Sequence, residues 1–399
     1  MLEHVRPKWV PVRPLNMRSR GNPESVCDPR DRKRTPARAE SQRGFILVLT
    51  LWIVAFFGLG VAAINTWVSR AIENARVLKE RAEGDLAFSD AKSEIIYALG
   101  TRPMTHRGLE TGRDLKRPDI TDMMSVMSAN YASSSYIAFD GRPYVLQGNP
   151  NYAIQLQDGR GLVNLNFITP DLLRRLLALY DVPETLRNQL PDTLADWIDD
   201  DDLTHLAGAE KTDYERRSRL LPSNAPLLTP REAQNILGWD EVPKLWEDDM
   251  KSPILTTCAV SGFNPNTAPK AALLTYVPGL TDQSASQVVE KRLDTQFRHA
   301  RDFMSAADVI VPNEAFFFSV SPGNCTIIDF VNRVTNERIR FSLSLIPLSQ
   351  NQPWQVDYAF RVPSQYRGAL DRADPGVTFP TPEALAPDQS ERNRAAGLR

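Results

Sequence analysis

The chain has 399 residues, long enough to bury the cores of two lobes of ordinary domain size. Its 47 Lys and Arg against 49 Asp and Glu leave a formal net charge of −2, unevenly distributed. Residues 1–44 hold eleven basic and five acidic side chains, so the rest of the chain carries about −8. An acidic body argues against nucleic acid as the main partner.

An apolar run follows the basic segment. Residues 44–64 read GFILVLTLWIVAFFGLGVAAI, 21 residues without a charged side chain. About 20 residues at 1.5 Å rise span a hydrocarbon core, so the run predicts a membrane helix. Basic flanks stay cytoplasmic, which predicts that the chain after the run lies across the membrane. No A-x-A cleavage site stands out after Ile64, and helical spacing continues to about Leu99. A simple single-pass anchor fits this hydropathy equally well.

The segments after residue 100 predict strands on both sides of a helical region. Short β-branched and aromatic runs between turn residues predict meander strands at 143–147, 152–157 and 161–166. Strands resume at 325–334, 337–348 and 354–362, the first two joined by Thr335-Asn336 at hairpin spacing. In between, apolar residues three or four apart predict helices. These helices cover 168–182, 184–200, 228–238, 268–277 and 282–293.

This order of elements predicts an α+β fold in which an all-α domain is inserted between strands. The expected division is a basic leader, a long helix, a body in two pieces, the inserted α-domain and a tail. The tail has too few apolar residues to pack, which predicts disorder. The boundaries are 1–44, 45–100, 101–167 with 321–362, 168–320, and 363–399.

Three cysteines are present, and Cys27 lies in the basic leader. The other two, Cys258 and Cys325, are an even number, which permits a disulfide in an oxidising compartment. Two buried free thiols are the alternative. The sequence leaves both open.

Carboxylates crowd one segment of the helical region: Asp196, Asp199, Asp200, Asp201, Asp202, Glu210 and Asp213. Such crowding raises carboxylate pKa values unless a cation or an arginine neutralises it. Calcium takes six to eight oxygens from flexible loops, and the spacing of Asp199, Asp201, Glu210 and Asp213 suits several of them. The D-x-[DN]-x-[DN]-G calcium signature is absent, so spacing alone favours a solvated acidic helix end or pairing with Arg216, Arg217 and Arg219.

Two short stretches are similar at a spacing of 100 residues. Asn164-Leu165-Asn166 and Asn264-Pro265-Asn266 each precede an expected helix, where side-chain amides cap free backbone N–H groups. The second stretch, 263–297, resembles the helix-hairpin-helix unit of DNA-binding competence and repair proteins. The rival interpretation is therefore a membrane-anchored periplasmic DNA-binding protein.

The hairpin of that unit argues against the rival interpretation. Helix-hairpin-helix proteins use a Gly-x-Gly hairpin to present backbone N–H groups to a phosphate. Here residues 278–282 contain one Gly and end at Asp282, which repels the phosphate backbone. We therefore expect no nucleic-acid partner.

Catalytic motifs are missing from the sequence. The four histidines are scattered, and no HExxH, GxSxG or P-loop pattern occurs. His205, beside Asp202, is interpreted as a surface residue. A two-carboxylate hydrolase at the aspartates would need a substrate cleft that the sequence does not define. We therefore expect a non-enzyme.

The junction Arg43-Gly44-Phe45 resembles that of type IV prepilins: a basic leader, Gly, Phe, then an apolar helix that continues into an amphipathic one. In that class a membrane-embedded aspartyl peptidase cuts after the Gly and methylates the new amine. The resemblance implies cleavage between Gly44 and Phe45 and N-methylation of Phe45. Most members carry Glu five residues into the mature chain, whereas this chain carries Leu49.

A missing Glu is typical of the K-type minor pseudopilin of the type II secretion system, general secretion pathway protein K. The chain resembles that family in the order of QDGRGLVNLN, LADWIDDDD, GAEKTDY, SNAPLLTPREAQNILG, FNPNTAP and the closing strands. The resemblance implies a pilin-like long N-terminal helix packed on an antiparallel sheet, with a SAM- or helix-hairpin-helix-like inserted α-domain. It also implies calcium binding at Asp199, Asp201, Glu210 and Asp213. The resemblance therefore favours a calcium site over the solvated or arginine-paired acidic segment that spacing alone favours.

The same resemblance implies the setting and the partners. The chain is expected in the bacterial inner membrane, single-pass, with its C-terminal domain in the periplasm. The expected partners are the I- and J-type minor pseudopilins, the major pseudopilin and the prepilin peptidase. The expected role is a filament tip that helps export folded proteins.

Overall fold

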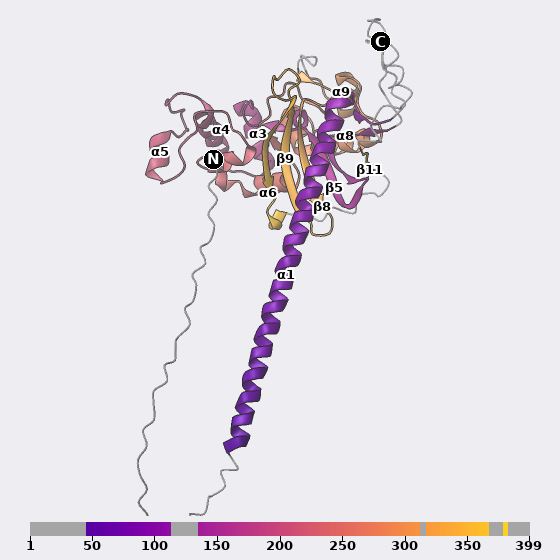
Figure 1. Cartoon of the computed structure of the whole chain (residues 1–399). Helices are drawn as coiled ribbons and strands as arrows, with labels where there is room; N and C mark the ends of the chain where they lie inside the picture. Colours follow the sequence, from indigo (N-terminus) through magenta and orange to yellow (C-terminus); the bar gives the residue numbers. More distant parts are fainter. Residues whose placement is uncertain (1–44, 113–134, 312–316, 367–377, 382–399) are drawn as a thin grey trace, which may run out of the picture. The chain divides into compact units, whose positions relative to one another are not determined.

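The computed structural model describes residues 45–112, 135–311, 317–366 and 378–381 (Figure 1). The predicted leader and Gly44 lie outside the described residues. The chain divides into two compact units, residues 1–75 and 76–399. The helix α1, Phe45–Thr101, begins at the residue that follows the predicted cleavage point.

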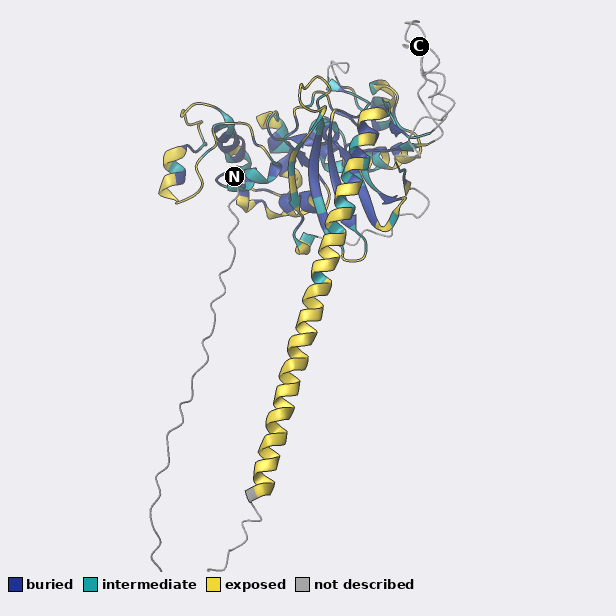
Figure 2. Ribbon diagram, viewed as in Figure 1, coloured by how far each residue is buried: buried dark blue, intermediate teal, exposed yellow. Residues whose placement is uncertain are grey.

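The described part of the first unit is the apolar portion of α1. Every described side chain from residue 46 to 75 is exposed (Figure 2). The polar side chains in it bond to the helix itself: Thr50 donates to the Leu47 carbonyl at 2.9 Å and Thr66 to the Ala63 carbonyl at 2.8 Å. By length and composition, α1 is the one helix of the described residues that fits a membrane span, as the sequence predicts.

The second unit contains a six-stranded sheet in the order β10-β9-β8-β5-β4-β11. The neighbours from β10 to β4 pair antiparallel, and β11 pairs parallel with β4. The strands are β4 Asp140–Leu146, β5 Asn149–Asp158, β8 Cys325–Asn332, β9 Arg338–Leu345, β10 Trp354–Arg361 and β11 Thr378–Phe379. A smaller sheet contains β1 Met104–Thr105, β2 Gly108–Glu110 and β3 Tyr136–Ile137.

The last turns of α1 pack on the large sheet. Ala91, Ile95 and Ala98 recur at helical spacing and are buried in one core with strand residues such as Ile154 and Phe341. Phe88 adds an edge-to-face contact with Phe341 at 5.5 Å between ring centroids. A long N-terminal helix on a mainly antiparallel sheet gives the α+β, pilin-like fold expected from the sequence.

The predicted disordered tail contains ordered elements, so that prediction is wrong for part of residues 363–399. Ser364–Tyr366 form a short 3-10 helix, η4, and β11 adds to the edge of β4. The reason is Phe379, whose side chain is 1% exposed and fills the core beneath the sheet. One aromatic residue supplies the apolar area that the rest of the tail lacks.

The elements between β5 and β8, adjacent strands of the sheet, are mostly helical. Thr169 caps α3 by accepting from the Leu172 N–H at 3.4 Å. The α-helices are α3 Pro170–Leu179, α4 Glu184–Ile198, α5 Lys211–Arg216, α6 Pro243–Lys251, α7 Lys270–Tyr276, α8 Asp282–Asp294 and α9 Ala300–Ala307. The 3-10 helices are η1 Gly159–Gly161, η2 Pro230–Asn235 and η3 Trp239–Glu241.

Two predictions within this region differ from the structure. The stretch 228–238 contains η2, a 3-10 helix with Pro230 at its start, rather than an α-helix. The stretch 161–166 contributes only β6, Val163–Asn164, which pairs parallel with β7, Leu255–Thr256, and not with the meander. The turn η1 separates β6 from β5. The limits of the proposed inserted domain, 168–320, stay a prediction.

A buried carboxylate joins the sheet to the helical elements. Asp158, at the end of β5, is fully buried, and its Oδ1 accepts from the N–H groups of Arg160 at 3.1 Å and Gly323 at 2.9 Å. Its Oδ2 accepts from Asn264 Nδ2 at 2.8 Å and Thr267 Oγ1 at 2.9 Å. One side chain therefore satisfies donors from three separate segments.

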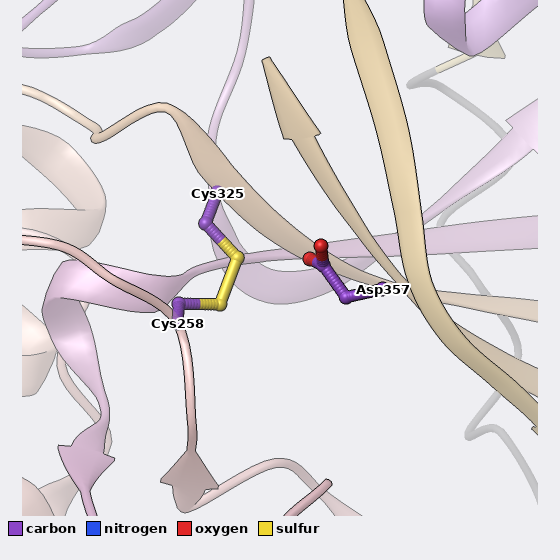
Figure 3. A group of neighbouring side chains, drawn as sticks. All are labelled: Cys258, Cys325 and Asp357. Carbon is purple, nitrogen blue, oxygen red and sulfur yellow. A yellow bond between two sulfur atoms is a disulfide. The ribbon is translucent and has the colours of Figure 1, made fainter. Parts of the chain in front are cut away.

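A second link is covalent. A disulfide joins Cys258, which follows β7, to Cys325, the first residue of β8 (Figure 3). These are the two cysteines that the sequence left as a pair or as free thiols. The bond closes a loop with a sequence separation of 67 residues and ties the helical elements to the sheet.

We predict that Asp158→Ala lowers the free energy of unfolding by about 3 kcal/mol or more, because it leaves several buried donors without an acceptor. The matched control is Asp294→Ala, at the exposed end of α8, which should change the free energy by less than about 0.5 kcal/mol. Denaturant unfolding of the full chain in detergent, followed by tryptophan fluorescence, measures both. Equal effects of the two substitutions would contradict the role of Asp158.

Candidate metal site

The site is built where α4 ends and the following loop folds back on it. Asp196, in the last turn of α4, is fully buried. It accepts hydrogen bonds from the His205 backbone N–H, at 3.1 Å, and from His205 Nδ1. One turn earlier, Asp192 Oδ2 accepts from the Ala207 N–H at 3.0 Å. The α4 carboxylates thus hold residues 205–207 against the helix.

Gly208 permits this close return of the chain. A Cβ at residue 208 would lie 1.9 Å from Asp196 Oδ2, far inside any allowed contact. Only a residue without a side chain fits, because the opposing group is a buried carboxylate held by two hydrogen bonds. Glu210, the N-cap of α5, follows two residues later, and its charge interacts with those of Asp196 and Asp199.

Several carboxylate oxygens of the site lack a side-chain partner. Glu210 Oε1 and Oε2 and Asp199 Oδ1 are buried and have no side-chain donor among the described residues. Glu210 is 5% exposed, so water does not freely solvate it. Asp196, Asp199 and His205 offer ligand atoms that all lie within 4.8 Å of one another. We name Asp196, Asp199 and Glu210 the carboxylate cluster.

The electrostatics of this cluster favour a cation. Burial raises the pKa of Asp199, and the charges of Asp201 and Asp196 raise it further. Burial likewise raises the pKa of Glu210, with further contributions from Asp196 and Asp199. The hydrogen bond to Asp196 raises the pKa of His205. Asp199 and Glu210 are thus destabilised in their charged forms by burial and by neighbouring acids, and a bound divalent cation would relieve that repulsion.

Of the four predicted ligands, Asp199 belongs to the group whose ligand atoms lie within 4.8 Å of one another. Glu210 lies outside that group, although the charges of Asp196 and Asp199 raise its pKa. Asp201 is exposed and accepts from the Leu203 N–H at 2.8 Å. Asp213 pairs with Arg216 at 2.5 Å and accepts from the Glu210 N–H at 3.2 Å. The arginine pairing considered from the sequence therefore occurs, but only at the outer carboxylate.

The sequence analysis missed Asp196 as a ligand, and its interpretation of His205 was incomplete. Asp196 precedes Asp199 by three residues, the spacing that places two side chains on one helix face, so a signal was present. His205 is half-exposed, but its ring binds Asp196 rather than only solvent. The return of the loop at Gly208 creates both contacts, and nothing in local spacing shows it.

The donor set suits a hard divalent cation. Buried carboxylate oxygens without partners are the ligands that calcium prefers, and its coordination number leaves places for water and carbonyl groups. Magnesium demands stricter geometry and keeps its waters, so it fits this set less well. The residues present therefore fit the calcium expected from the sequence.

The two Asn-x-Asn stretches adopt the same local structure. Asn164 Oδ1 accepts from the Asn166 N–H at 3.1 Å, and Asn264 Oδ1 from the Asn266 N–H at 3.0 Å. The second Asn of each stretch binds both backbone groups of one distant residue. Asn166 binds the N–H and C=O of Leu227, and Asn266 those of Phe297. These asparagines fix turns and distant chain segments instead of capping the next helix.

The N-terminus of α8 does not offer a phosphate site. Thr281 Oγ1 already accepts from the Ser284 N–H at 3.1 Å. Asp282, the first residue of α8, pairs with Lys270 at 2.7 Å. An acid and its lysine partner therefore lie where a helix-hairpin-helix protein would receive a phosphate.

A family model described as "Type II secretion system (T2SS), protein K" matches residues 157–243. The matched span runs from the end of β5 through the carboxylate cluster to the start of α6. The match confirms the resemblance predicted from the sequence. No curated protein matches the chain. Among solved structures, a chain of the GspK-GspI-GspJ complex from the enterotoxigenic Escherichia coli type 2 secretion system is similar, with a TM-score of 0.44 and 16% identity. The similarity covers 72% of this chain and 100% of that chain.

We predict that Gly208→Ala destabilises the chain by about 1–3 kcal/mol, because the added methyl group forces the loop away from Asp196. The matched control is Gly148→Ala, in the turn between β4 and β5, where a Cβ meets nothing within 4 Å. Thermal unfolding of both variants measures the difference. If Gly208→Ala has the same melting temperature as Gly148→Ala, the loop does not close on Asp196.

Proposed function

We propose that this chain, a type II secretion system protein K by its family match at residues 157–243, is the minor pseudopilin at the tip of the secretion pseudopilus. The family match is the observation that carries the proposal. The apolar helix that begins at Phe45 and the pilin-like sheet packed on its last turns support it. A tip subunit nucleates the filament and helps export folded proteins across the outer membrane.

Processing at the N-terminus is the first step of the proposed role. The prepilin peptidase cuts between Gly44 and Phe45 and methylates the amine of Phe45. Two features support this proposal: the basic segment before Gly44 and the apolar helix that follows it. The leader stays cytoplasmic, so the mature chain lies in the inner membrane with residues after the apolar run in the periplasm.

Leu49 accounts for the position at the tip. A Glu at this place would be costly in an apolar environment unless it paired with the terminal amine of a neighbouring subunit. Leu49 cannot make that pair, so no subunit is needed ahead of this one. The helical elements between β5 and β8 add bulk that blocks another subunit from joining above.

The proposed partners are the I- and J-type minor pseudopilins, followed by the major pseudopilin. Apolar helices associate in a bilayer through close packing at small residues. Gly58 and Gly60 lie on α1 with nothing within 4 Å of an added Cβ, so another helix has room to approach. No step of this role requires catalysis, and we propose a non-enzymatic protein.

Calcium is the proposed ion of the carboxylate cluster, held by Asp199, Glu210 and Asp196. Bound there, it would supply positive charge that neutralises the cluster and fixes the loop against α4. The chain's own residues would provide the oxygens that otherwise lack partners. The loop from residue 199 to 210 would then be more rigid with calcium than without it.

We predict that calcium at 100 times its dissociation constant stabilises the chain by about 2.7 kcal/mol, and that a chelator removes this gain. Asp199→Asn with Glu210→Gln should abolish the shift, because both unpartnered carboxylates lose their charge. Asp213→Asn, whose native side chain pairs with Arg216, should keep most of the shift. Melting curves with calcium and with chelator measure all three proteins. An equal melting temperature of the wild type with calcium and with chelator would contradict the proposed site.

We predict that cells lacking this chain fail to release type II substrates into the medium, and that wild type restores release. The chain should also co-purify with I- and J-type pseudopilins from detergent. Gly58→Leu with Gly60→Leu should weaken this complex at least about tenfold, because bulky residues keep the helices apart. The control Val54→Leu with Val61→Leu changes apolar residues of the same run and should retain it. Undiminished secretion without the chain would exclude the proposed role.

A further inference from the structure

Three side chains of metal-binding type meet at the disulfide. Cys258 follows β7, Cys325 begins β8, and Asp357 lies on β10 (Figure 3). One sulfur from each cysteine and one carboxylate oxygen all lie within 4.8 Å of one another. The sulfur-bearing residues are buried, whereas Asp357 is exposed and leaves a route from solvent.

A single hydroxyl group lies among the three. Ser342 Oγ, on β9, donates to Asp357 Oδ2 at 2.9 Å. The same oxygen lies 3.3 Å from Cys325 Sγ and 3.7 Å from Cys258 Sγ. Ser342 is fully buried. Two sulfurs and a carboxylate therefore already converge on one small polar atom.

The carboxylate is held in this direction by its neighbours. Ser344 Oγ donates to Asp357 Oδ2 at 2.7 Å, and Gln355 Nε2 donates to Oδ1 at 3.2 Å. The pairing of β10 with β9 shifts register between Val356 and Tyr358, which places Asp357 at an irregularity that re-aims its side chain. Hydrogen-bonded carboxylates of this kind are typical of metal ligands with an outer shell of donors.

We propose that the reduced chain binds one zinc ion through Cys258, Cys325 and Asp357. A phosphine or a dithiol supplies the two electrons that break the S–S bond. A phosphine takes the oxygen of one water and becomes a phosphine oxide, and the two protons of that water pass to the sulfurs; a dithiol becomes a disulfide and its two protons pass to the sulfurs. Zinc then replaces the two thiol protons and forms two Zn–S bonds, releasing two protons to solvent. The Asp357 carboxylate supplies the third ligand, and a water or Ser342 Oγ the fourth.

The ligand types select the metal. Thiolates are soft donors that suit zinc in four-coordinate sites, whereas calcium takes only oxygen ligands. This site is therefore chemically distinct from the carboxylate cluster, and the proposal does not depend on the proposed role in secretion. Zinc would tie the same segments as the disulfide, so a chain that has not been oxidised keeps the link between the helical elements and the sheet.

The test uses the full chain in detergent, once oxidised and once reduced with a phosphine that is then removed without oxygen. Zinc is titrated against both forms, with the metal content and the melting temperature as readouts. We expect one more zinc ion per reduced chain than per oxidised chain, and a melting temperature of the reduced form that rises with zinc. Cobalt in place of zinc should give the charge-transfer absorption of a cobalt–thiolate bond.

Asp357→Asn should weaken zinc binding to the reduced chain by about 10- to 100-fold, the range seen when a metal site loses one supporting group. The matched control Asp294→Asn should leave it unchanged. Equal zinc binding by the oxidised and reduced wild type would overturn the proposal, as would full affinity in Asp357→Asn. The wild-type comparison needs no substitution, so it decides the question even where a variant fails to fold.

Discussion

The exposed apolar surface of the first part of α1 is the constraint on which the rest depends. From residue 46 to 75 every described side chain of α1 is exposed, and the run is apolar enough to cross a membrane. Water is an unfavourable environment for this surface, so it requires lipid or the helices of other subunits. The same helix ends in the core of the sheet, where Ile95 and Ala98 are buried. One continuous helix therefore has an apolar part suited to a membrane and a last part that packs in the folded body. A pilin-like subunit requires both.

The body depends on a few buried polar groups that join its parts. Asp158 binds donors from three segments, and the buried Arg340 pairs with Asp329 at 2.7 Å while it donates to the Asp249 carbonyl at the end of α6. Breaking either group leaves a buried charge or donors unpaired, which costs more than the loss of an exposed pair. The carboxylate cluster differs, since Asp199 Oδ1 and both Glu210 carboxylate oxygens are buried without a side-chain donor among the described residues. That contrast is why we assign the cluster to an ion and Asp158 to the framework.

The sequence predicted what depends on local pattern. Uninterrupted helical spacing predicted α1 to about Leu99, two residues before its end at Thr101, and the runs at 325–334, 337–348 and 354–362 located β8, β9 and β10. Prediction from the sequence failed where contacts between residues far apart in the chain determine the local structure. The two residues of β11 carry no strand signal, and only the core position of Phe379 orders them. Spacing alone did not show that Asp196 and His205 lie beside Asp199, because Gly208 lets the loop return to α4. Nor did it show that Asp213 pairs with Arg216.

The central claim is that the apolar helix becomes a free N-terminus after a peptidase acts at the end of the basic leader. Mass spectrometry of the native protein, purified from membranes and digested, identifies that first residue and its modification directly. The account predicts a terminal peptide that begins with N-methylated Phe45. A native chain that begins at Met1 or Met17 would contradict it and would leave an ordinary single-pass membrane protein.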